Sequence, residues 1–279
     1  MPSSETKAKS PSISELSALK YNTENLTSRI SYDLVSAFCS STLVAPLICL
    51  IDQSIIIRTH SSESISQIFT THLKKALRKP WVFLTSRPYL LVNTLYFATY
   101  TAANAADTAV STVYNKPASK VTPGTSKFLL TSTANISICL YKDAQFAKLF
   151  GGGAGKSAAK KVVPKASLAL FALRDSMTIL ASFNLPHYLA PLLGSQHAAQ
   201  FLAPAGMQLF STPLHLLGLD LFNRPQGQPK APPFAERWRM VRRDWFGASF
   251  ARMGRIVPAY GIGGVVNTKI RKHLMTRFD

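Results

Sequence analysis

Charged residues are scarce in this 279-residue chain, at 16% against the roughly 25% of soluble domains. Acids are scarcer still, with 13 Asp and Glu against 32 Lys and Arg, and from Ser176 to Leu219 no charge of either sign occurs. The basic residues interrupt long uncharged runs rather than gathering on one face or tail, which disfavours nucleic acid and favours a lipid surface. We therefore expect a protein of the lipid bilayer, with anionic lipid at its basic loops and no nucleic-acid partner.

Cysteine is also rare. Cys39, Cys49 and Cys139 form no CxxC pair and have no histidine at zinc-like spacing, so they are expected to be buried small hydrophobic residues. The sequence shows no nucleophile–base pair, and the stretch Gly151–Ser157 has one residue too few between its glycines for a phosphate loop. We expect no enzyme, no cofactor and no metal, and His215 is expected to pack or to form hydrogen bonds.

The first thirty residues contain no apolar run of the kind found in a secretory signal. They are rich in Ser and Thr, and the acids Glu5, Glu15 and Glu24 fit a cleaved mitochondrial presequence poorly. Residues 1–28 are predicted to form a disordered polar tail, followed by a single membrane domain over residues 29–279.

Long uncharged runs make up most of that domain. Leu34–Ile51 has 18 residues without a charge, within the range of about 17–25 for a transmembrane helix, and such a helix tolerates Pro46. Five further apolar segments follow at Pro88–Ala106, Phe128–Tyr141, Ala166–Leu193, Gln200–Leu219 and Phe250–Thr268. The pattern predicts an all-α membrane protein with six transmembrane helices.

The connections between these segments alternate in charge. Residues 108–127 and 194–199 together have three Lys and Arg, whereas the other three connections have sixteen. These basic connections are residues 55–80, 145–165 and 222–245. Within the first, His60–Lys79 has apolar residues at helical spacing, which predicts an amphipathic interfacial helix. Since positive short loops stay on the untranslocated side, both termini are predicted to lie opposite the basic loops.

These features recur three times, which indicates a degenerate tandem repeat. Each unit has an apolar helix that ends in an acid, a basic connection and a second apolar helix. The acids Asp52, Asp143 and Asp220 are 91 and 77 residues apart, and the second helices align through Arg174 and Arg255. The units span about 29–118, 122–194 and 195–279.

In this arrangement the chain resembles the mitochondrial carrier superfamily over about residues 30–275. The similarity is clearest at Gly254-Arg255-Ile-Val-Pro258-Ala-Tyr-Gly-Ile-Gly, which is similar to an even-numbered carrier helix. The resemblance implies three two-helix repeats around a pseudo-threefold axis, with short amphipathic helices on one side. It also implies a place in the mitochondrial inner membrane and lipid of the cardiolipin type at the basic loops.

The resemblance further implies a central substrate site on the even-numbered helices. Arg174-Asp175 matches the paired arginine and acid that carriers often present there, and Arg255 matches the arginine of the sixth helix. The second helix would add three polar residues, Thr85, Asn93 and Thr94. The alternative for Arg174 and Asp175 is a structural ion pair that holds helices together.

The carrier gate signature, Pro-x-[Asp/Glu]-x-x-[Lys/Arg], is missing, because uncharged residues follow Pro46 and Pro213. One hypothesis replaces the gate by a charge ring of three acids with nearby bases: Asp52, Asp143 and Asp220 with Lys142, Arg58 and Arg224. The alternative is that these residues are helix-end charges at the level of the lipid headgroups, where they cost little.

Two functions follow from this pattern. The first is transport of a small anionic or zwitterionic metabolite across the mitochondrial inner membrane, since a buried charge is expensive to keep without a use. The second is a carrier-fold membrane adaptor that does not transport and lies in the outer membrane. The missing gate signature favours the adaptor, and the polar residues on the even-numbered helices favour the transporter.

Overall fold

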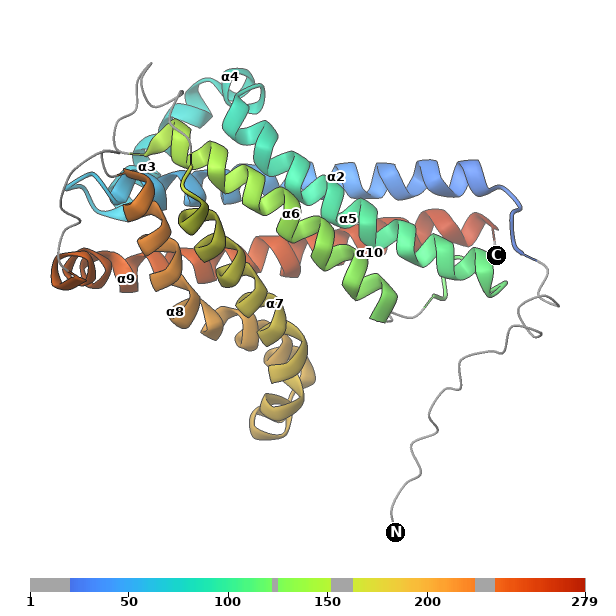
Figure 1. Cartoon of the computed structure of the whole chain (residues 1–279). Helices are drawn as coiled ribbons and strands as arrows, with labels where there is room; N and C mark the ends of the chain where they lie inside the picture. The colour runs from blue at the N-terminus through green and yellow to red at the C-terminus, as the bar shows by residue number, and fades with distance from the viewer. Residues whose placement is uncertain (1–20, 122–124, 152–162, 224–233, 279) are drawn as a thin grey trace, which may run out of the picture.

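The computed structural model of the protein describes residues 21–121, 125–151, 163–223 and 234–278, and within these ranges all regular structure is helical. Figure 1 shows the arrangement of the helices. In chain order they are α2 (Leu26–Arg58), α3 (Ile65–Arg78), α4 (Pro80–Leu84), α5 (Arg87–Val113), α6 (Thr125–Phe150), α7 (Lys165–Leu193), α8 (Gln196–Asn223), α9 (Phe234–Ile256), the π-helix η2 (Val257–Gly263), α10 (Gly264–Met275) and the 3₁₀ turn η3 (Thr276–Phe278).

The helices extend beyond the apolar runs that predict them. Helix α2 has 33 residues and includes Pro46, although its uncharged run has 18. Its first turns include the buried residues Arg29 and Asp33, which bond to Ser111 of α5 and to Arg271 of α10 in place of water. Most of the predicted tail, residues 1–20, lies outside the described residues.

The helices form two groups (Figure 1). Helices α2, α5, α6 and the run from α9 to α10 lie along the long axis, and α7 and α8 form a hairpin that diverges from them. Helix α7 packs more extensively against α8 than against α6, although the repeat pairs it with α6. Gly218 permits this close approach, because a Cβ there would lie 2.6 Å from the Phe171 ring. Three two-helix units around a threefold axis are therefore not confirmed.

The last apolar segment is part of a longer helical run. The sequence predicts a basic connection and then a separate helix at Phe250–Thr268, whereas α9, η2 and α10 are continuous from Phe234 to Met275. Pro258 removes a backbone donor, and the helix widens into a π-helix there instead of ending. The Tyr100 hydroxyl donates to the carbonyl of Ala259 at 2.6 Å, which satisfies one carbonyl of this turn.

The predicted amphipathic helix is confirmed as α3. It starts with a capping box in which the Ser64 side chain accepts from the Gln67 backbone and the Gln67 side chain accepts from the Ser64 backbone. Pro80 then starts the short helix α4, which the sequence analysis missed. The start of α2 and the end of α10 lie at one end of the molecule, opposite α3 and the start of α9 (Figure 1).

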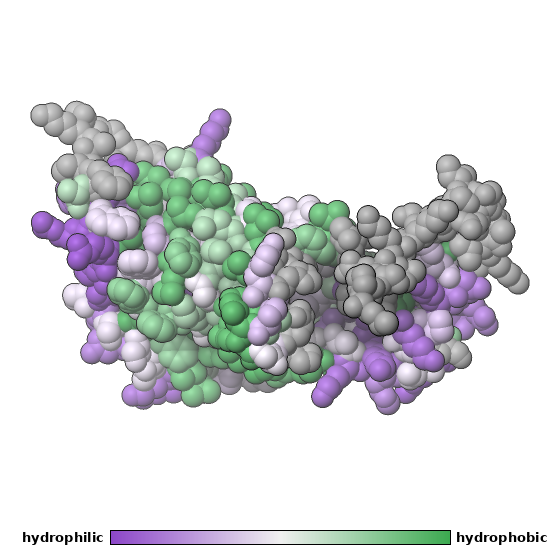
Figure 2. Space-filling view, turned by 90° about the horizontal axis from the view of Figure 1, so that it is seen from below, coloured by the Kyte–Doolittle hydropathy of each residue, from purple (hydrophilic) through white to green (hydrophobic). Residues whose placement is uncertain are grey.

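One described helix, α2, is long and apolar enough to cross a membrane, with a mean hydropathy of 2.2 over its best window. Six spans are thus not confirmed by length and composition. The face in Figure 2 has hydrophobic residues in a broad middle zone and hydrophilic residues toward both ends. Cys49 and Cys139 are buried as predicted, but Cys39 is exposed.

A polar layer fixes α10 against α2 and α5 at the end near the chain termini. Arg271 Nε lies 2.7 Å from Asp33 Oδ1, and its Nη2 donates to the Thr108 hydroxyl at 2.9 Å. Asn104 and Asn267 exchange two side-chain hydrogen bonds of 3.0 and 2.8 Å. We call these five residues the terminal layer. It closes this end of the bundle with polar groups that bond to one another and to Ser36 and the Ala118 carbonyl.

Adjacent glycines in the last helical run provide a test of this packing. At Gly263 a Cβ would lie 2.9 Å from Val44 Cγ1 and would clash with the Tyr100 hydroxyl, whereas at Gly264 it would meet nothing. Gly263→Ala is expected to destabilise the protein by about 1–3 kcal/mol through overpacking. Gly264→Ala is expected to be neutral or stabilising by about 0.5–1 kcal/mol. Thermal unfolding in detergent measures both, and equal melting temperatures for the two variants would contradict the packing described.

Candidate functional site

The apolar helices bring six charged side chains together in the interior. Lys142 Nζ lies 2.5 Å from Asp52 Oδ2 and 2.8 Å from Asp143 Oδ1. Arg174 Nη2 lies 2.5 Å from Asp143 Oδ2 and 2.6 Å from Asp175 Oδ1. Arg255 Nη1 lies 3.0 Å from Asp52 Oδ1. We call this set the charge chain: Arg255–Asp52–Lys142–Asp143–Arg174–Asp175. It links α2, α6, α7 and α9.

Burial makes these contacts obligatory. The side chains of Lys142 and Arg174 are each 1% exposed, and an unpaired ion at such a position costs several kcal/mol. Lys142 lies over the Phe146 ring and Arg174 over the Phe171 ring, with centroid distances of 5.1 and 5.6 Å. The cations are thus held by carboxylates on one side and by aromatic faces on the other.

His215 on α8 completes the surroundings of Arg174. Arg174 Nη1 lies 2.7 Å from His215 Nδ1. Because a guanidinium can only donate, Nδ1 is the acceptor and the proton of the neutral ring lies on Nε2. His215 therefore adds no charge to the chain, and it forms a hydrogen bond as the sequence analysis expects.

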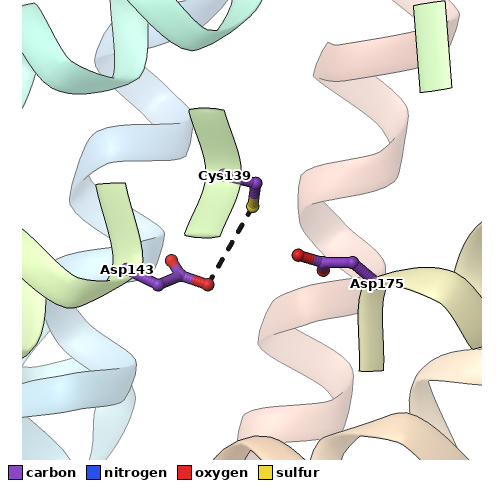
Figure 3. A group of neighbouring side chains, drawn as sticks. All are labelled: Cys139, Asp143 and Asp175. Atoms are coloured by element: carbon purple, nitrogen blue, oxygen red, sulfur yellow. Dashed lines mark hydrogen bonds between the residues drawn. The ribbon is translucent and has the colours of Figure 1, made fainter. Parts of the chain in front are cut away.

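Three potential metal ligands lie next to one another here. Cys139 and Asp143 are one turn apart on α6, and Asp175 faces them from α7 (Figure 3), with ligand atoms within 4.8 Å of one another. However, Arg174 Nη2 donates to Asp143 at 2.5 Å and to Asp175 at 2.7 Å, and it lies 3.6 Å from Cys139 Sγ. A guanidinium already occupies the position where these ligands converge, so the cluster does not fit a metal cation.

Two small cavities border the charge chain. The first, the central cavity, has about 40 Å³ and lies between α5, α6, α7, α8 and α9. Its polar lining residues are Tyr96, Asn135, Asp175, Thr178, Gln208 and Arg255. The second, the arginine cavity, has about 10 Å³, and its polar lining residues are Asp52, Asp143, Arg174, His215, Arg252 and Arg255. Arg255 lines both cavities.

The structure brings several predicted residues together. Arg174, Asp175 and Arg255 from the predicted substrate site lie in one network with Asp52, Lys142 and Asp143 from the predicted charge ring. The two sets are therefore a single site. Arg174 and Asp175 also pair with each other, as the structural alternative proposes.

No ion pair among the described residues adds a further member of the predicted ring to the charge chain. Asp220 is buried, but no ion pair among the described residues joins it to Asp52 or Lys142. Arg58 pairs with Asp244 of α9 at 2.8 Å instead. Arg224 lies outside the described residues. Of the three predicted acids, the described ion pairs thus join Asp52 and Asp143 through Lys142.

The polar residues expected from the second helix do not reach the central cavity. Thr85 and Thr94 are exposed and line a separate side pocket of about 360 Å³ between α5 and α6, which reaches Lys142. Asn93 is half-buried, and its Oδ1 has no hydrogen-bond partner among the described residues. The contribution of α5 to the central cavity is Leu95 and Tyr96.

Arg252, Gln208 and Asn135 were missed by the sequence analysis. Arg252 precedes Arg255 by three residues, which places both on one face of a helix, and this spacing was a readable signal. Gln208 and Asn135 are uncharged amides in apolar segments, and the sequence contains no comparable signal for them. The Gln208 Oε1 accepts from Arg252 Nε at 3.0 Å, so α8 and α9 meet through these residues.

The comparisons with known proteins decide the family. The model of a family described as "Probable citrulline exporter" matches residues 36–275. The chain belongs to this family. A search of the curated proteins found no match.

The assignment to the mitochondrial carrier superfamily was wrong, since the matching family is a different one. The missing Pro-x-[Asp/Glu]-x-x-[Lys/Arg] signature agrees with this correction. The location in the mitochondrial inner membrane and the binding of cardiolipin rested on the carrier resemblance alone and lose that support. A membrane transporter of a small molecule remains, because an exporter family implies both a bilayer and a small substrate.

A double-mutant cycle tests the charge chain. Asp52→Asn leaves Lys142 and Arg255 short of a counter-ion and is expected to destabilise the protein by about 3–5 kcal/mol. Combining it with Lys142→Met removes both charges of one pair, so the double variant is expected to be less destabilised than the sum, with a coupling of about 0.5–3 kcal/mol. Denaturant unfolding in detergent measures the four proteins.

The matched cycle pairs Lys142→Met with Asp220→Asn. Because no ion pair joins these residues, their effects are expected to add within about 0.5 kcal/mol. Coupling of Lys142 to Asp220 as strong as its coupling to Asp52 would restore the charge ring and contradict the network described.

Proposed function

We propose that this protein transports citrulline, or a closely similar zwitterionic amino acid, across a membrane, and that the central cavity is its substrate site. The observation that supports this proposal most directly is the lining of that cavity. Asp175 and Arg255 offer one carboxylate and one guanidinium to the same space. A zwitterion presents the complementary ammonium and carboxylate groups, and charge-assisted hydrogen bonds to both are strong in such a dry site.

The neutral side chains of the cavity suit the rest of such a substrate. Citrulline ends in a ureido group, which has one carbonyl acceptor and several N–H donors. Asn135 and Gln208 have amides that both donate and accept, and Thr178 adds a hydroxyl. An amino acid with a cationic side chain would place a second positive charge near Arg255, which disfavours it. The lining thus supports selection for a neutral polar side chain.

Polar contacts close the site toward both ends of the molecule. The charge chain lies on the side of the basic connections, and the terminal layer of Asp33, Arg271 and Thr108 lies on the other side. The central cavity of about 40 Å³ has room for one or two waters, so an amino acid enters only when helices separate. Opening one polar layer at a time would expose the site to one side of the membrane at a time.

Six membrane crossings form part of this proposal. Helices α2, α5, α6, α7 and α8 have 33, 27, 26, 29 and 28 residues, and a span needs about 20. The run from α9 to α10 supplies the sixth crossing. Within α2, the 19 steps along the helix from Asp33 to Asp52 correspond to about 28 Å, close to the roughly 30 Å of a bilayer core.

Reconstitution tests the transport proposal. Proteoliposomes with the protein are expected to exchange labelled citrulline well above empty liposomes. Asp175→Asn removes the partner of the substrate ammonium and is expected to lower this transport by at least tenfold, while Arg174 keeps its bond to Asp143. Glu236→Gln, the same chemical change on the exposed surface of α9, is the control and is expected to transport normally.

Citrulline exchange no greater than that of empty liposomes would overturn this proposal. That result would favour the alternative function, a membrane adaptor that does not transport. Equal loss of transport in Asp175→Asn and Glu236→Gln would instead show that the loss in Asp175→Asn is not specific to the central cavity, and the assignment of that cavity as the substrate site would fail.

Cysteine labelling tests the six crossings. Ser62→Cys, in the turn before α3, and Lys272→Cys, on α10, place exposed thiols at opposite ends of the bundle. In a variant whose native cysteines are replaced, an impermeant maleimide is expected to label only one of the two positions in sealed, uniformly oriented vesicles. A protein that crosses the membrane with α2 alone would show both positions on the same side.

A further inference from the structure

A buried arginine beside the charge chain has no carboxylate partner among the described residues. Arg252 on α9 is 2% exposed. Its Nε donates to Gln208 Oε1 at 3.0 Å, and no carboxylate of the described residues forms an ion pair with it. The desolvation of such a cation costs several kcal/mol when nothing compensates it. A protein that keeps this arrangement has either a structural reason for it or a ligand that supplies the missing charge.

The neighbouring carboxylates are already engaged. Asp52 binds Lys142 and Arg255, whereas Asp143 binds Lys142 and Arg174. Asp175 binds Arg174. Around the arginine cavity, four cations therefore face three carboxylates, and His215 is neutral because its Nδ1 accepts from Arg174. The cluster has one positive charge in excess, which a single monoanion would neutralise.

We infer that Arg252 anchors the carboxylate of the transported substrate. This inference rests on the proposed function and adds the requirement that a substrate has a free carboxylate. Arg252 lines the arginine cavity, and Arg255 lines both this cavity and the central one. A displacement of Arg255 joins the two spaces, so an amino acid extends from Arg252, at its carboxylate, to Asp175, at its ammonium.

The chemistry of the arginine favours a carboxylate. Its planar fork donates two parallel hydrogen bonds, which match the two oxygens of a carboxylate. A dianion such as phosphate would leave the cluster with an excess of negative charge, whereas a monocarboxylate leaves it neutral. Thus Arg252 selects for charge and geometry, and the amides of the central cavity select for the side chain.

The transport test compares citrulline with its carboxamide, in which the carboxylate is replaced by a neutral amide. In the wild-type protein, the carboxamide is expected to compete with labelled citrulline at least tenfold less well. In Arg252→Gln the KM for citrulline is expected to rise at least tenfold, and the two compounds should then compete about equally. Arg239→Gln, the same substitution on the exposed side of α9, is expected to keep the wild-type preference.

Arg252→Lys keeps the charge but lacks the fork, and it is expected to retain part of the preference for the carboxylate. This variant also serves if Arg252→Gln does not fold. A variant without the arginine that still discriminates tenfold between citrulline and its carboxamide would overturn the inference.

A second readout does not depend on which amino acid is transported. In detergent at fixed ionic strength, acetate is expected to raise the melting temperature of the wild-type protein, and acetamide is not. Arg252→Gln is expected to lose the acetate effect, and without ligand it should melt at the same temperature as the wild type or above it, because a buried uncompensated charge has gone.

The two readouts separate the two proposals. If wild-type liposomes do not move citrulline but acetate stabilises the wild type and not Arg252→Gln, the citrulline proposal fails and the carboxylate site stands. If acetate stabilises neither protein, or stabilises both equally, Arg252 is a structural residue and the inference fails even where citrulline is transported.

Discussion

The pairing of Lys142 with Asp52 and Asp143 is the contact on which the interior depends. An ammonium that is 1% exposed is tolerable only because two carboxylates lie within 2.8 Å of it. Those carboxylates also form ion pairs with Arg255 and Arg174. The ion pairs therefore connect α6 to α2, α7 and α9. These ion pairs thus fix the positions of the four helices relative to one another. The apolar residues favour burial of the helices, and the ion pairs determine which helices face one another.

This dependence also shapes how the bundle can move. In the charge chain each carboxylate except Asp175 binds two cations, so one contact cannot be released without changing the next. The terminal layer has the same character, with Thr108 donating to Asp33 and accepting from Arg271. Cooperative networks of this kind have few stable intermediate arrangements. A protein closed by two such layers fits a function in which each end is either shut or open.

Much of the fold could be predicted from the sequence, because apolar runs and their basic connections follow local rules. The helix α3 was readable from His60–Lys79, and the first five apolar runs each lie within one helix, whereas Phe250–Thr268 spans α9, η2 and α10. Helix partners could not be predicted in this way, since the hairpin of α7 and α8 depends on the fit between Gly218 and the Phe171 ring. Pro258 was equally ambiguous, because a proline ends one helix and only widens another.

The candidate site could also be predicted only in part: its charged residues were found from the sequence, but several of their partners were not. Charged residues in apolar runs stand out in any sequence, which is why Arg174, Asp175 and Arg255 were found together with Asp52 and Lys142. Their partners were assigned less well, and Arg58 binds Asp244 rather than the interior cluster. A repeat also led to the wrong family, because three similar charge patterns arise wherever paired helices alternate with basic loops, whatever the ancestry.

The excess positive charge at Arg252 explains how binding of the substrate can promote the opening of the charge chain. Arg255 is held by Asp52 at 3.0 Å and lines both cavities. On the proposed binding mode, a carboxylate placed between Arg252 and Arg255 offers Arg255 a second anion and weakens its hold on Asp52. Because Asp52 also binds Lys142, a weaker pair between Arg255 and Asp52 would alter the contacts of Lys142. Through Lys142 it would affect the rest of the charge chain, which lies on the side of the basic connections. A ligand shifts such an equilibrium only through its different affinity for the closed and open states. Here the difference would arise because the carboxylate of the substrate supplies a negative charge to Arg252, which pairs with no carboxylate of the described residues.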